Sequence, residues 1–170
     1  MKRNLLSLLI VMITVQPVLF GQSGMRQAGF RMGYTGGIFY QLSNEAGNAE
    51  IAYNAMLGFR NNRLQLTGLR IVYGTAINSI SHDLYFAWGY GGHAGFMNID
   101  RHDYYHDSYG FQRRQFCPVI GIDGWLAAEY RIREIPLNIS LNIKPYLELT
   151  IPQYVRVMPF DLALSVSYIF

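Results

Sequence analysis

The stretch Phe160-Asp161-Leu162-Ala163-Leu164-Ser165-Val166-Ser167-Tyr168-Ile169-Phe170 decides the fold. Successive side chains of a strand point to opposite faces, and here one face carries the large apolar residues: Phe160, Leu162, Leu164, Val166, Tyr168 and Phe170. The other face carries small or polar residues, Asp161, Ala163, Ser165 and Ser167, and only Ile169 breaks the pattern. A soluble protein would leave such a strand as a sticky edge. A membrane barrel uses it to close the cylinder with the apolar face toward lipid, so we interpret it as the C-terminal insertion signal of an outer-membrane barrel.

The N-terminal region has the features of a secretory signal peptide. Lys2 and Arg3 form a basic start, residues 5–13 are apolar apart from Ser7, and Gly21 is small enough to precede a cleavage site. An N-terminal membrane anchor is the alternative, but the apolar run is shorter than the roughly 20 residues that a spanning helix needs. We expect residues 1–21 to be a signal peptide and residues 22–170 to form one outer-membrane β-barrel domain.

The composition favours a membrane protein built from strands. The chain is 51% hydrophobic and 15% aromatic, with 13 Tyr and 17 Gly, yet after residue 21 no stretch approaches the roughly 18 apolar residues of a transmembrane helix. The net charge of +3 includes Lys2 and Arg3 and forms no basic stripe, so nucleic acid is not an expected partner. The single cysteine, Cys117, excludes an intramolecular disulfide. We expect no cofactor and no metal.

Alternation of apolar and polar residues recurs along the rest of the chain. The longest case runs from Pro136 to Ile151 and exceeds the ~9–11 residues with which a tilted strand crosses a bilayer. Pro145 lies on its apolar face and costs one hydrogen bond between strands, which predicts a local irregularity. Five further segments alternate in the same way: residues 30–41, 50–60, 63–73, 83–90 and 117–132.

The links between these segments set the expected strand count. Asn61-Asn62 indicates a tight hairpin, because Asn tolerates positive φ. The apolar residues of 63–73 change parity after Leu66, which predicts a bulge at Gly68. With residues 160–170 there are seven segments, and a closed bacterial barrel needs an even number. A break at Gly91-Gly92 would give the eighth strand around residues 93–99; alternatively, a strand lies within residues 103–116.

The residues opposite the apolar face form the expected interior. Eight strands enclose a space only wide enough to be filled by side chains. The charged residues assigned to it, five acidic and five basic, are Arg31, Glu50, Arg60, Arg70, Asp123, Glu129, Arg131, Lys144, Glu148 and Asp161. Because each buried charge needs a partner, this balance favours a cross-linked polar plug over a water-filled pore. We therefore expect no general porin activity.

Residues 100–116 are a candidate binding surface. If the last strand ends in the periplasm, this stretch and residues 152–159 are extracellular and the turn at Arg133 is periplasmic. Tyr and Arg dominate binding hot spots, and Arg suits the phosphates of lipopolysaccharide. The candidate surface-binding residues are Arg101, Tyr104, Tyr105, Tyr109, Arg113 and Arg114. The alternative is a girdle of aromatic residues and arginines at the membrane interface.

The histidines support two weaker hypotheses. His102 and His106 are four residues apart and would suit a divalent metal on a helix, but the loop favours no helix and a solvated surface loop is the simpler interpretation. His93 with Ser and Glu partners would form the triad of a lipid hydrolase. No motif singles out a Ser, so we assign no catalytic residues and expect no enzyme activity.

The run from Gly121 to Pro145, GIDGWLAAEYRIREIPLNISLNIKP, resembles small outer-membrane β-barrel proteins of the Bacteroidota. Those proteins carry a similar Asp-Gly…Glu-Tyr…Ile-Pro-Leu-Asn-Ser…Lys-Pro stretch and a last strand ending in aromatic-X-Phe, here Tyr168-Ile169-Phe170. The likeness covers residues 117–170 and, more loosely, 30–97. Asn142 stands where Asp is expected, and Ser167 where Arg is usual. The resemblance implies a porin-like family, a barrel fold and an outer-membrane location, but no activity.

These observations predict an all-β, closed, up-and-down antiparallel transmembrane β-barrel of eight strands in a Gram-negative outer membrane. Its expected role is structural or adhesive, or that of a small subunit of an envelope assembly. A lipid-modifying outer-membrane enzyme is the main alternative; a soluble lipocalin-like barrel would need polar outer faces, which residues 137–151 do not have. Expected partners are outer-membrane lipid and lipopolysaccharide, the barrel-assembly machinery during insertion, and an unidentified envelope protein.

Overall fold

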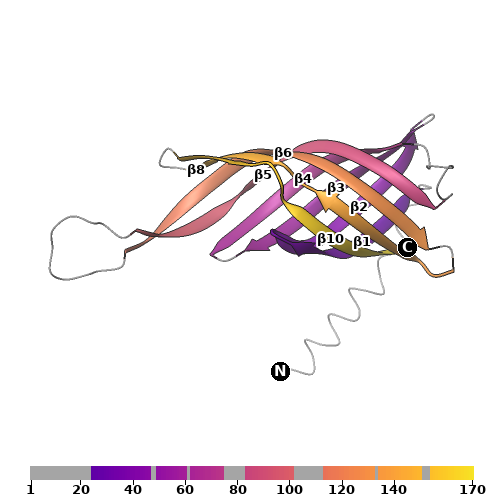
Figure 1. Cartoon of the computed structure of the whole chain (residues 1–170), viewed down its shortest axis with the longest axis horizontal. Coiled ribbons are helices and arrows are strands. Elements are labelled where there is room, and N and C mark those ends of the chain that lie inside the picture. The colour runs from indigo at the N-terminus through magenta and orange to yellow at the C-terminus, as the bar shows by residue number, and fades with distance from the viewer. Residues whose placement is uncertain are drawn as a thin grey trace, which may run out of the picture.

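The computed structural model describes residues 24–46, 49–60, 62–74, 83–101, 113–132, 134–150 and 154–170. The strands of these residues close into one antiparallel barrel (Figure 1). Within the described part of the chain, no helix combines the length and the apolar character needed to cross a membrane. The predicted signal peptide, residues 1–21, lies outside the described residues.

Ten strand segments form the eight strands of the barrel. The first six barrel strands are unbroken: β1 (Met25–Gly33), β2 (Gly36–Ala46), β3 (Ala49–Arg60), β4 (Arg63–Tyr73), β5 (Leu84–Arg101) and β6 (Arg113–Ile132). The last two are each interrupted once: β7 (Leu137–Ile143) continues as β8 (Tyr146–Thr150), and β9 (Tyr154–Met158) continues as β10 (Leu162–Ile169). The predicted all-β, eight-stranded, up-and-down architecture is confirmed.

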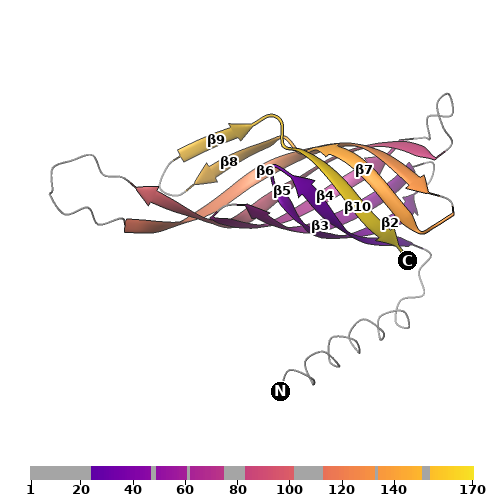
Figure 2. The ribbon, with the colours of Figure 1, turned by 60° about the horizontal axis from the view of Figure 1, so that its bottom comes forward.

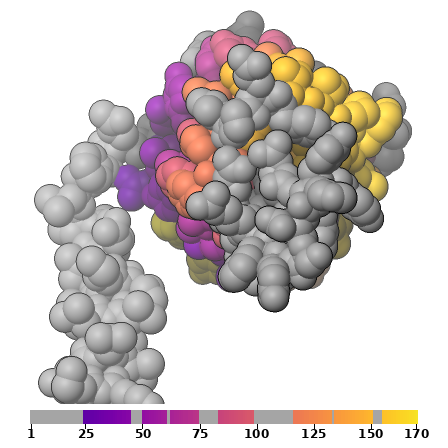
Figure 3. Space-filling model, turned by 90° about the vertical axis from the view of Figure 1, so that its left-hand side faces the viewer, coloured from indigo at the N-terminus to yellow at the C-terminus, as the bar shows by residue number. Residues whose placement is uncertain are grey.

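Closure joins the two ends of the described chain. Each barrel strand pairs antiparallel with the next in sequence, and β1 pairs with β10 from Gln27↔Ile169 to Gly33↔Ala163. The β5–β6 pairing, from Leu84↔Tyr130 to Arg101↔Arg113, completes the circle. Figure 3 looks at the molecule along the barrel and shows its rounded outline.

The two ends of the barrel differ in height. One end holds the start of β1 and the end of β10; we call it the terminal end. At the opposite end, the hairpin end, β5 and β6 extend well beyond the short β1–β2 turn, and the β8–β9 hairpin lies beside them (Figure 2). Residues 154–158 belong to this hairpin, so the predicted loop over residues 152–159 is in part a strand.

The predicted alternation of outward apolar and inward small or polar side chains on the last strand is confirmed. On β10 the outward side chains Leu162, Leu164 and Tyr168 are 44–52% exposed. The inward Ala163, Ser165 and Ser167 are each 3% exposed. The Asn61-Asn62 hairpin is also confirmed: Asn62 has a φ of 60°, and Arg60 pairs directly with Arg63.

Strand β4 corrects the predicted bulge at Gly68. The strand keeps one alternation from Arg63 to Tyr73, and β3 pairs with it residue by residue through Ala55↔Gly68. Residues 69, 71 and 73 therefore point inward and Arg70 points outward, so the prediction that Arg70 lies inside was wrong. The physical reason is that the barrel also contains an apolar cluster, formed by Ala52, Leu69, Ile71, Tyr73, Ala87, Trp125 and Ala127.

The strand count of eight is correct, but two of the predicted assignments are wrong. β5 runs without a break through Gly91-Gly92, which pair with Leu69 and Gly68 on β4. Residues 30–41, predicted as one strand, contain the turn between β1 and β2 at residues 34–35. The prediction divides β5 into two strands and joins β1 and β2 into one, so the two errors cancel in the strand count.

The two interruptions of the wall have different geometries. β6 pairs with β7 and β8 in a single register (Leu126↔Ile143, Asp123↔Tyr146), so the predicted irregularity at Pro145 breaks the strand without adding a residue. Between β9 and β10, three residues (159–161) face the two residues that separate β7 from β8. This extra residue is a β-bulge, and it reverses which parity points inward.

We expect Gly91→Ala to lower the free energy of unfolding by about 1–3 kcal/mol, because overpacking forces the backbone to move. A β-carbon at Gly91 would overlap the backbone carbonyl oxygen of Gly68. Gly68→Ala is the matched control, since a β-carbon there meets nothing within 4 Å. Urea titration of the folded protein in lipid vesicles measures both. Equal stability of the two variants would contradict this account of the β4–β5 contact.

Candidate functional site

The charged interior is the main candidate site. Nine of the ten charged residues assigned to it from the sequence lie at inward positions, and Arg70 does not. Arg63, which sequence reasoning missed, takes its place and is 7% exposed. The charged side chains that line the interior thus include five acidic and five basic ones: Glu50, Asp123, Glu129, Glu148, Asp161, Arg31, Arg60, Arg63, Arg131 and Lys144. Arg156 on β9, the register partner of the inward Glu148, adds a sixth cation at the rim of the hairpin end.

The centre of the barrel holds a continuous chain of five titratable side chains. The Lys144 ammonium group donates to Oδ1 of Asp123 at 2.9 Å, and Oδ2 of Asp123 lies 2.8 Å from Nδ1 of His93. Across the imidazole ring, Nε2 of His93 lies 3.2 Å from Oε2 of Glu148. The Arg63 guanidinium donates to the second Glu148 oxygen. These side chains come from four of the eight barrel strands, so they cross-link half of the wall from inside.

Arg31 connects the first and last barrel strands. Its Nη1 lies 3.2 Å from Oδ1 of Asp161, and its Nε donates to Oδ1 of Asn142 at 2.8 Å. The guanidinium also donates to the backbone carbonyl oxygens of Thr35 and Asp161. The Thr35 amide donates to Asp161 Oδ1 at 3.1 Å. Asp161, supplied by the bulge, therefore neutralises Arg31 and ties down the β1–β2 turn.

Glu129 is held by neutral donors. Asn138 donates to Oε2 of Glu129 at 2.8 Å, and the Tyr73 hydroxyl, 3.0 Å from the carboxylate, accepts a hydrogen bond of 2.7 Å from Gln41. Burying a carboxylate costs free energy unless its oxygens accept hydrogen bonds. The two donors to Glu129 meet this requirement.

Arg131 and Glu50 form the least buried ion pair of the interior. Both guanidinium Nη atoms lie 3.0–3.1 Å from the Glu50 carboxylate, and the two side chains are 14% and 18% exposed. The Arg131 guanidinium also lies 4.4 Å from the ring centre of Tyr85. Rigid bidentate pairing and contact with an aromatic face are the features for which Arg is preferred over Lys.

At the hairpin end, two cations meet one aromatic ring. The Arg60 guanidinium lies 3.4 Å from the ring centre of Tyr34, and Arg156 donates to the Tyr34 hydroxyl at 2.8 Å. Such cation–π contacts stabilise the charge where the barrel opens. The predicted inward position of Arg60 is therefore at the rim of the interior.

His93 is the residue with the most evident chemical potential. It is 3% exposed, and carboxylates occupy both of its ring nitrogens. The hypothesis of a Ser-His-Glu triad placed a Ser against this ring, whereas the hydrogen-bond partners in the structure are Asp123 and Glu148. Within the described part of the chain, no group of three or more His, Cys, Asp or Glu side chains is arranged to hold a metal ion.

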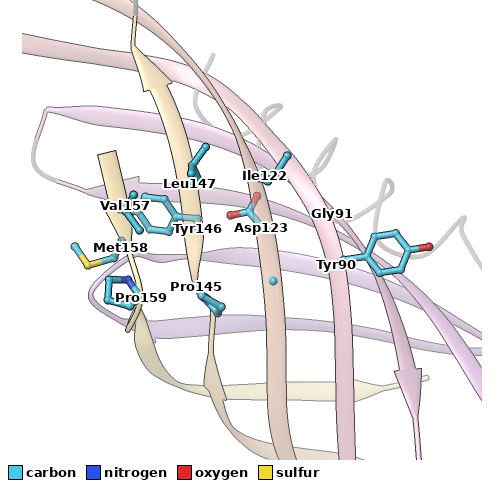
Figure 4. A pocket seen from close by; sticks show the side chains of 11 residues that line it. Tyr90, Gly91, Ile122, Asp123, Pro145, Tyr146, Leu147, Val157, Met158 and Pro159 are labelled. Carbon is cyan, nitrogen blue, oxygen red and sulfur yellow. The ribbon is translucent and has the colours of Figure 1, made fainter. Parts of the chain in front are cut away.

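A groove on the outer surface lies beside Asp123 of the central chain of titratable side chains. The groove has a volume of about 590 Å³ and opens where Pro145 interrupts the seventh barrel strand, and Tyr90, Ile122 and Val157 are among its lining residues. Asp123 and Tyr146 lie at its inner side, between β6 and β8 (Figure 4). Its lining is largely apolar apart from Asp123. The groove is therefore a depression in the apolar outer surface whose floor reaches the charged interior.

The candidate surface-binding loop lies largely outside the described residues. The backbone of Arg101 pairs with Arg113, and that of Asp100 with Arg114, which extends the β5–β6 hairpin. Residues 102–112, with Tyr104, Tyr105 and Tyr109, are not described, nor are the side chains of the three arginines of the loop. The loop remains a sequence-based prediction, as do His102 and His106.

The missed interior residues left a detectable signal. Arg63 starts the polar row that Gln65 and Thr67 continue on β4, and all three are at most 7% exposed. Because Leu64 and Leu66 point outward, alternation alone places Arg63 inside, with or without a bulge at Gly68. His93 was hidden because Gly91-Gly92 suggested a turn.

Replacing Asp123 with Leu should lower the free energy of unfolding by about 3–5 kcal/mol, because the variant leaves the Lys144 ammonium group buried without its counter-ion. The double variant D123L/K144M should recover most of this loss, since both charges are removed. Urea titration in lipid vesicles, followed by tryptophan fluorescence, measures the difference.

Glu50→Gln is the control for this series. The Glu50–Arg131 pair is less enclosed than the Asp123–Lys144 pair, and the amide that Glu50→Gln introduces still accepts a hydrogen bond from Arg131, so this variant should lower the free energy of unfolding less than D123L does. Equal losses for D123L and E50Q would show that the central chain of charges does not support the barrel.

Comparison with known proteins adds no named relative. No protein-family model matches the chain, and no curated protein matches its sequence. The functional interpretation therefore rests on the geometry of the barrel.

Proposed function

We propose that this chain is an integral outer-membrane β-barrel protein of a Gram-negative bacterium, with a side-chain-filled interior and a structural or adhesive role, or a role as a small subunit of an envelope assembly. The observation that carries the proposal is the inverted distribution of polarity. Large apolar side chains cover the outside while charged ones are buried within. In water this arrangement would expose far more apolar surface than a soluble protein tolerates.

The outer surface fits a lipid environment along its whole circumference. Exposed apolar residues occur on every barrel strand, and examples from five of them are Phe30, Leu66, Trp88, Ile122 and Leu141. Exposed aromatic side chains occur toward both ends: the rings of Phe96 and Phe116 stack at 4.6 Å at the hairpin end, and Tyr168 and Phe170 stack at the terminal end. Outward apolar bands bordered by aromatic girdles are typical of transmembrane barrels.

The interior supports a plug rather than a pore. The central charges are paired directly with one another, with side-chain exposures of 0–3% for Arg63, His93, Asp123, Lys144 and Glu148. A lumen that conducted ions would keep such groups hydrated instead. The same enclosure supports a role without catalysis, because His93 has carboxylates on both ring nitrogens.

The hairpin end supports a role in contact with other molecules. In the described sheet, β9 pairs with β8 along one edge and stands last in the strand order. Its outward Val155 and Val157 are 60% and 64% exposed. An open strand edge accepts a further strand from a partner, which suits an adhesive protein or an assembly subunit. Lipopolysaccharide and an envelope protein are the partners we propose at this end.

The remaining parts of the proposal come from the sequence. The signal peptide of residues 1–21 would direct export, and the alternating last strand would direct insertion by the barrel-assembly machinery. Kinship with the small outer-membrane barrels of the Bacteroidota is part of the same proposal. A lipid-modifying enzyme is the competing function, and it would require the buried His93 to become accessible to substrate.

Site-directed spin labelling tests the membrane location. After Cys117→Ala, a label on Leu141→Cys should be accessible to oxygen dissolved in lipid and shielded from a water-soluble nickel complex, because Leu141 points outward. A label on the neighbouring Ser140→Cys should be shielded from both, because Ser140 points inward. A label at position 141 that is accessible to the nickel complex would refute the proposal.

Planar-bilayer recording tests the absence of a pore. The purified protein should insert without producing stable channels of large conductance, because charged side chains fill the interior. A general porin of known conductance serves as the positive control. Stable and reproducible conductance steps of large size from the wild-type protein would contradict the proposal that side chains fill the interior.

A further inference from the structure

Arg70 is a cation on the apolar outer wall. It points outward from β4, on the same face as Leu64 and Leu66. Among the described residues, no ion pair, hydrogen bond or aromatic contact satisfies its guanidinium group. In contrast, the interior cations Arg31, Arg63 and Lys144 each have a carboxylate oxygen within 3.2 Å. The outward cation therefore lacks the counter-ion that the inward ones have.

A groove lies directly beside this guanidinium. On the outer face Arg70 stands between Tyr53 and Tyr90, its register partners on β3 and β5. One step toward the hairpin end, the row across the same strands consists of small residues, Ala55, Gly68 and Gly92. The groove has a volume of about 470 Å³, and its lining residues include Tyr40, Tyr53, Gly68, Arg70 and Tyr90.

The position of Arg70 along the barrel indicates which part of a membrane it meets. It lies three residues before β4 ends at Tyr73, at the terminal end. In outer-membrane barrels this end faces the periplasm, and aromatic side chains such as Tyr53 and Tyr90 favour the level of the lipid headgroups. A guanidinium at that level attracts a phosphate group, with which it forms short charge-assisted hydrogen bonds.

We propose that Arg70 and this groove form a binding site for one anionic phospholipid of the periplasmic leaflet. The phosphate diester pairs with the Arg70 guanidinium, and an acyl chain lies over Gly68 between Tyr40 and Tyr90. The site rests on the proposed outer-membrane function, because its acyl chain must come from a bilayer. Free phosphate would leave the apolar groove unfilled. Lipopolysaccharide phosphates belong to the other leaflet, near the hairpin end.

Native mass spectrometry of the full chain in detergent tests the site. The wild-type protein should retain one phosphatidylglycerol, and Arg70→Gln should weaken this binding about tenfold or more, because it removes a charge-assisted hydrogen bond. Arg70→Lys should bind with intermediate affinity. The control is Arg156→Gln, which removes a partly exposed cation at the hairpin end, hydrogen-bonded to Tyr34, and should retain the lipid.

Gly68→Leu separates the groove from the charge. A β-carbon at Gly68 meets nothing within 4 Å and the position faces outward, so this variant should fold, keep Arg70, fill the groove and lose the lipid. Glycerol phosphate, phosphatidylcholine and lipid A are the comparison ligands, and each should compete poorly with phosphatidylglycerol. Equal retention of phosphatidylglycerol by wild type and R70Q overturns the site, as does competition by lipid A or by glycerol phosphate at similar concentration.

The two proposals fail in distinguishable ways. If spin labels at position 141 are exposed to water, the membrane location is wrong and the lipid site falls with it. If those labels lie in lipid while R70Q and wild type retain phosphatidylglycerol equally, the barrel stands and the lipid site alone is wrong.

Discussion

The pairing of charges across the interior is the interaction on which the rest of this structure depends. An eight-stranded barrel has no room for a hydrated lumen, so a charged side chain inside must be paired with an opposite charge or hydrogen-bonded by groups from other strands. The pairs that do this join segments far apart in sequence: Arg31 with Asp161, and Arg63 with Glu148. Closure of the wall and neutralisation of the interior are thus the same event, because neither pair can form in an open sheet.

The two interruptions of the wall serve this interior. The bulge at residues 159–161 inserts one residue, which turns Asp161 inward while leaving Phe160 and Leu162 outward. Asp161 then reaches Arg31, and its backbone carbonyl accepts a hydrogen bond of 3.0 Å from the Lys144 amide. The break at Pro145 adds no residue, so Lys144 keeps its inward position and reaches Asp123. The bulge therefore turns inward a charged side chain that a regular strand would have turned outward, whereas the break at Pro145 keeps Lys144 in the regular alternation of the strand.

Sequence reasoning succeeded where the two faces of a strand differ in polarity and failed where they do not. Residues 137–149 and 160–170 alternate cleanly, so their faces and the barrel fold followed from parity alone. β4 was misjudged because the apolar cluster fills part of the interior, and Leu69 and Ile71 were assigned to lipid when they lie inside. Gly91-Gly92 suggested a turn, although Gly91 allows close approach of β5 to Gly68 on β4, and Gly92 lies against Gly121 on β6. The partners of His93 depend on register across three strands, which no local pattern encodes.

The placement of Arg70 follows from the same balance of charge. The fully enclosed cations Arg31, Arg63 and Lys144 each have a carboxylate partner, and Arg70 at an inward position would add a buried charge without a counter-ion. The regular alternation of β4 instead takes Arg63 inside and sends Arg70 out. An outward guanidinium on an apolar wall still needs an anion, and within the described residues the protein offers none. Its counter-ion must then come from the surroundings, and in the membrane location that we propose the anion at the level of the lipid headgroups would be a phosphate.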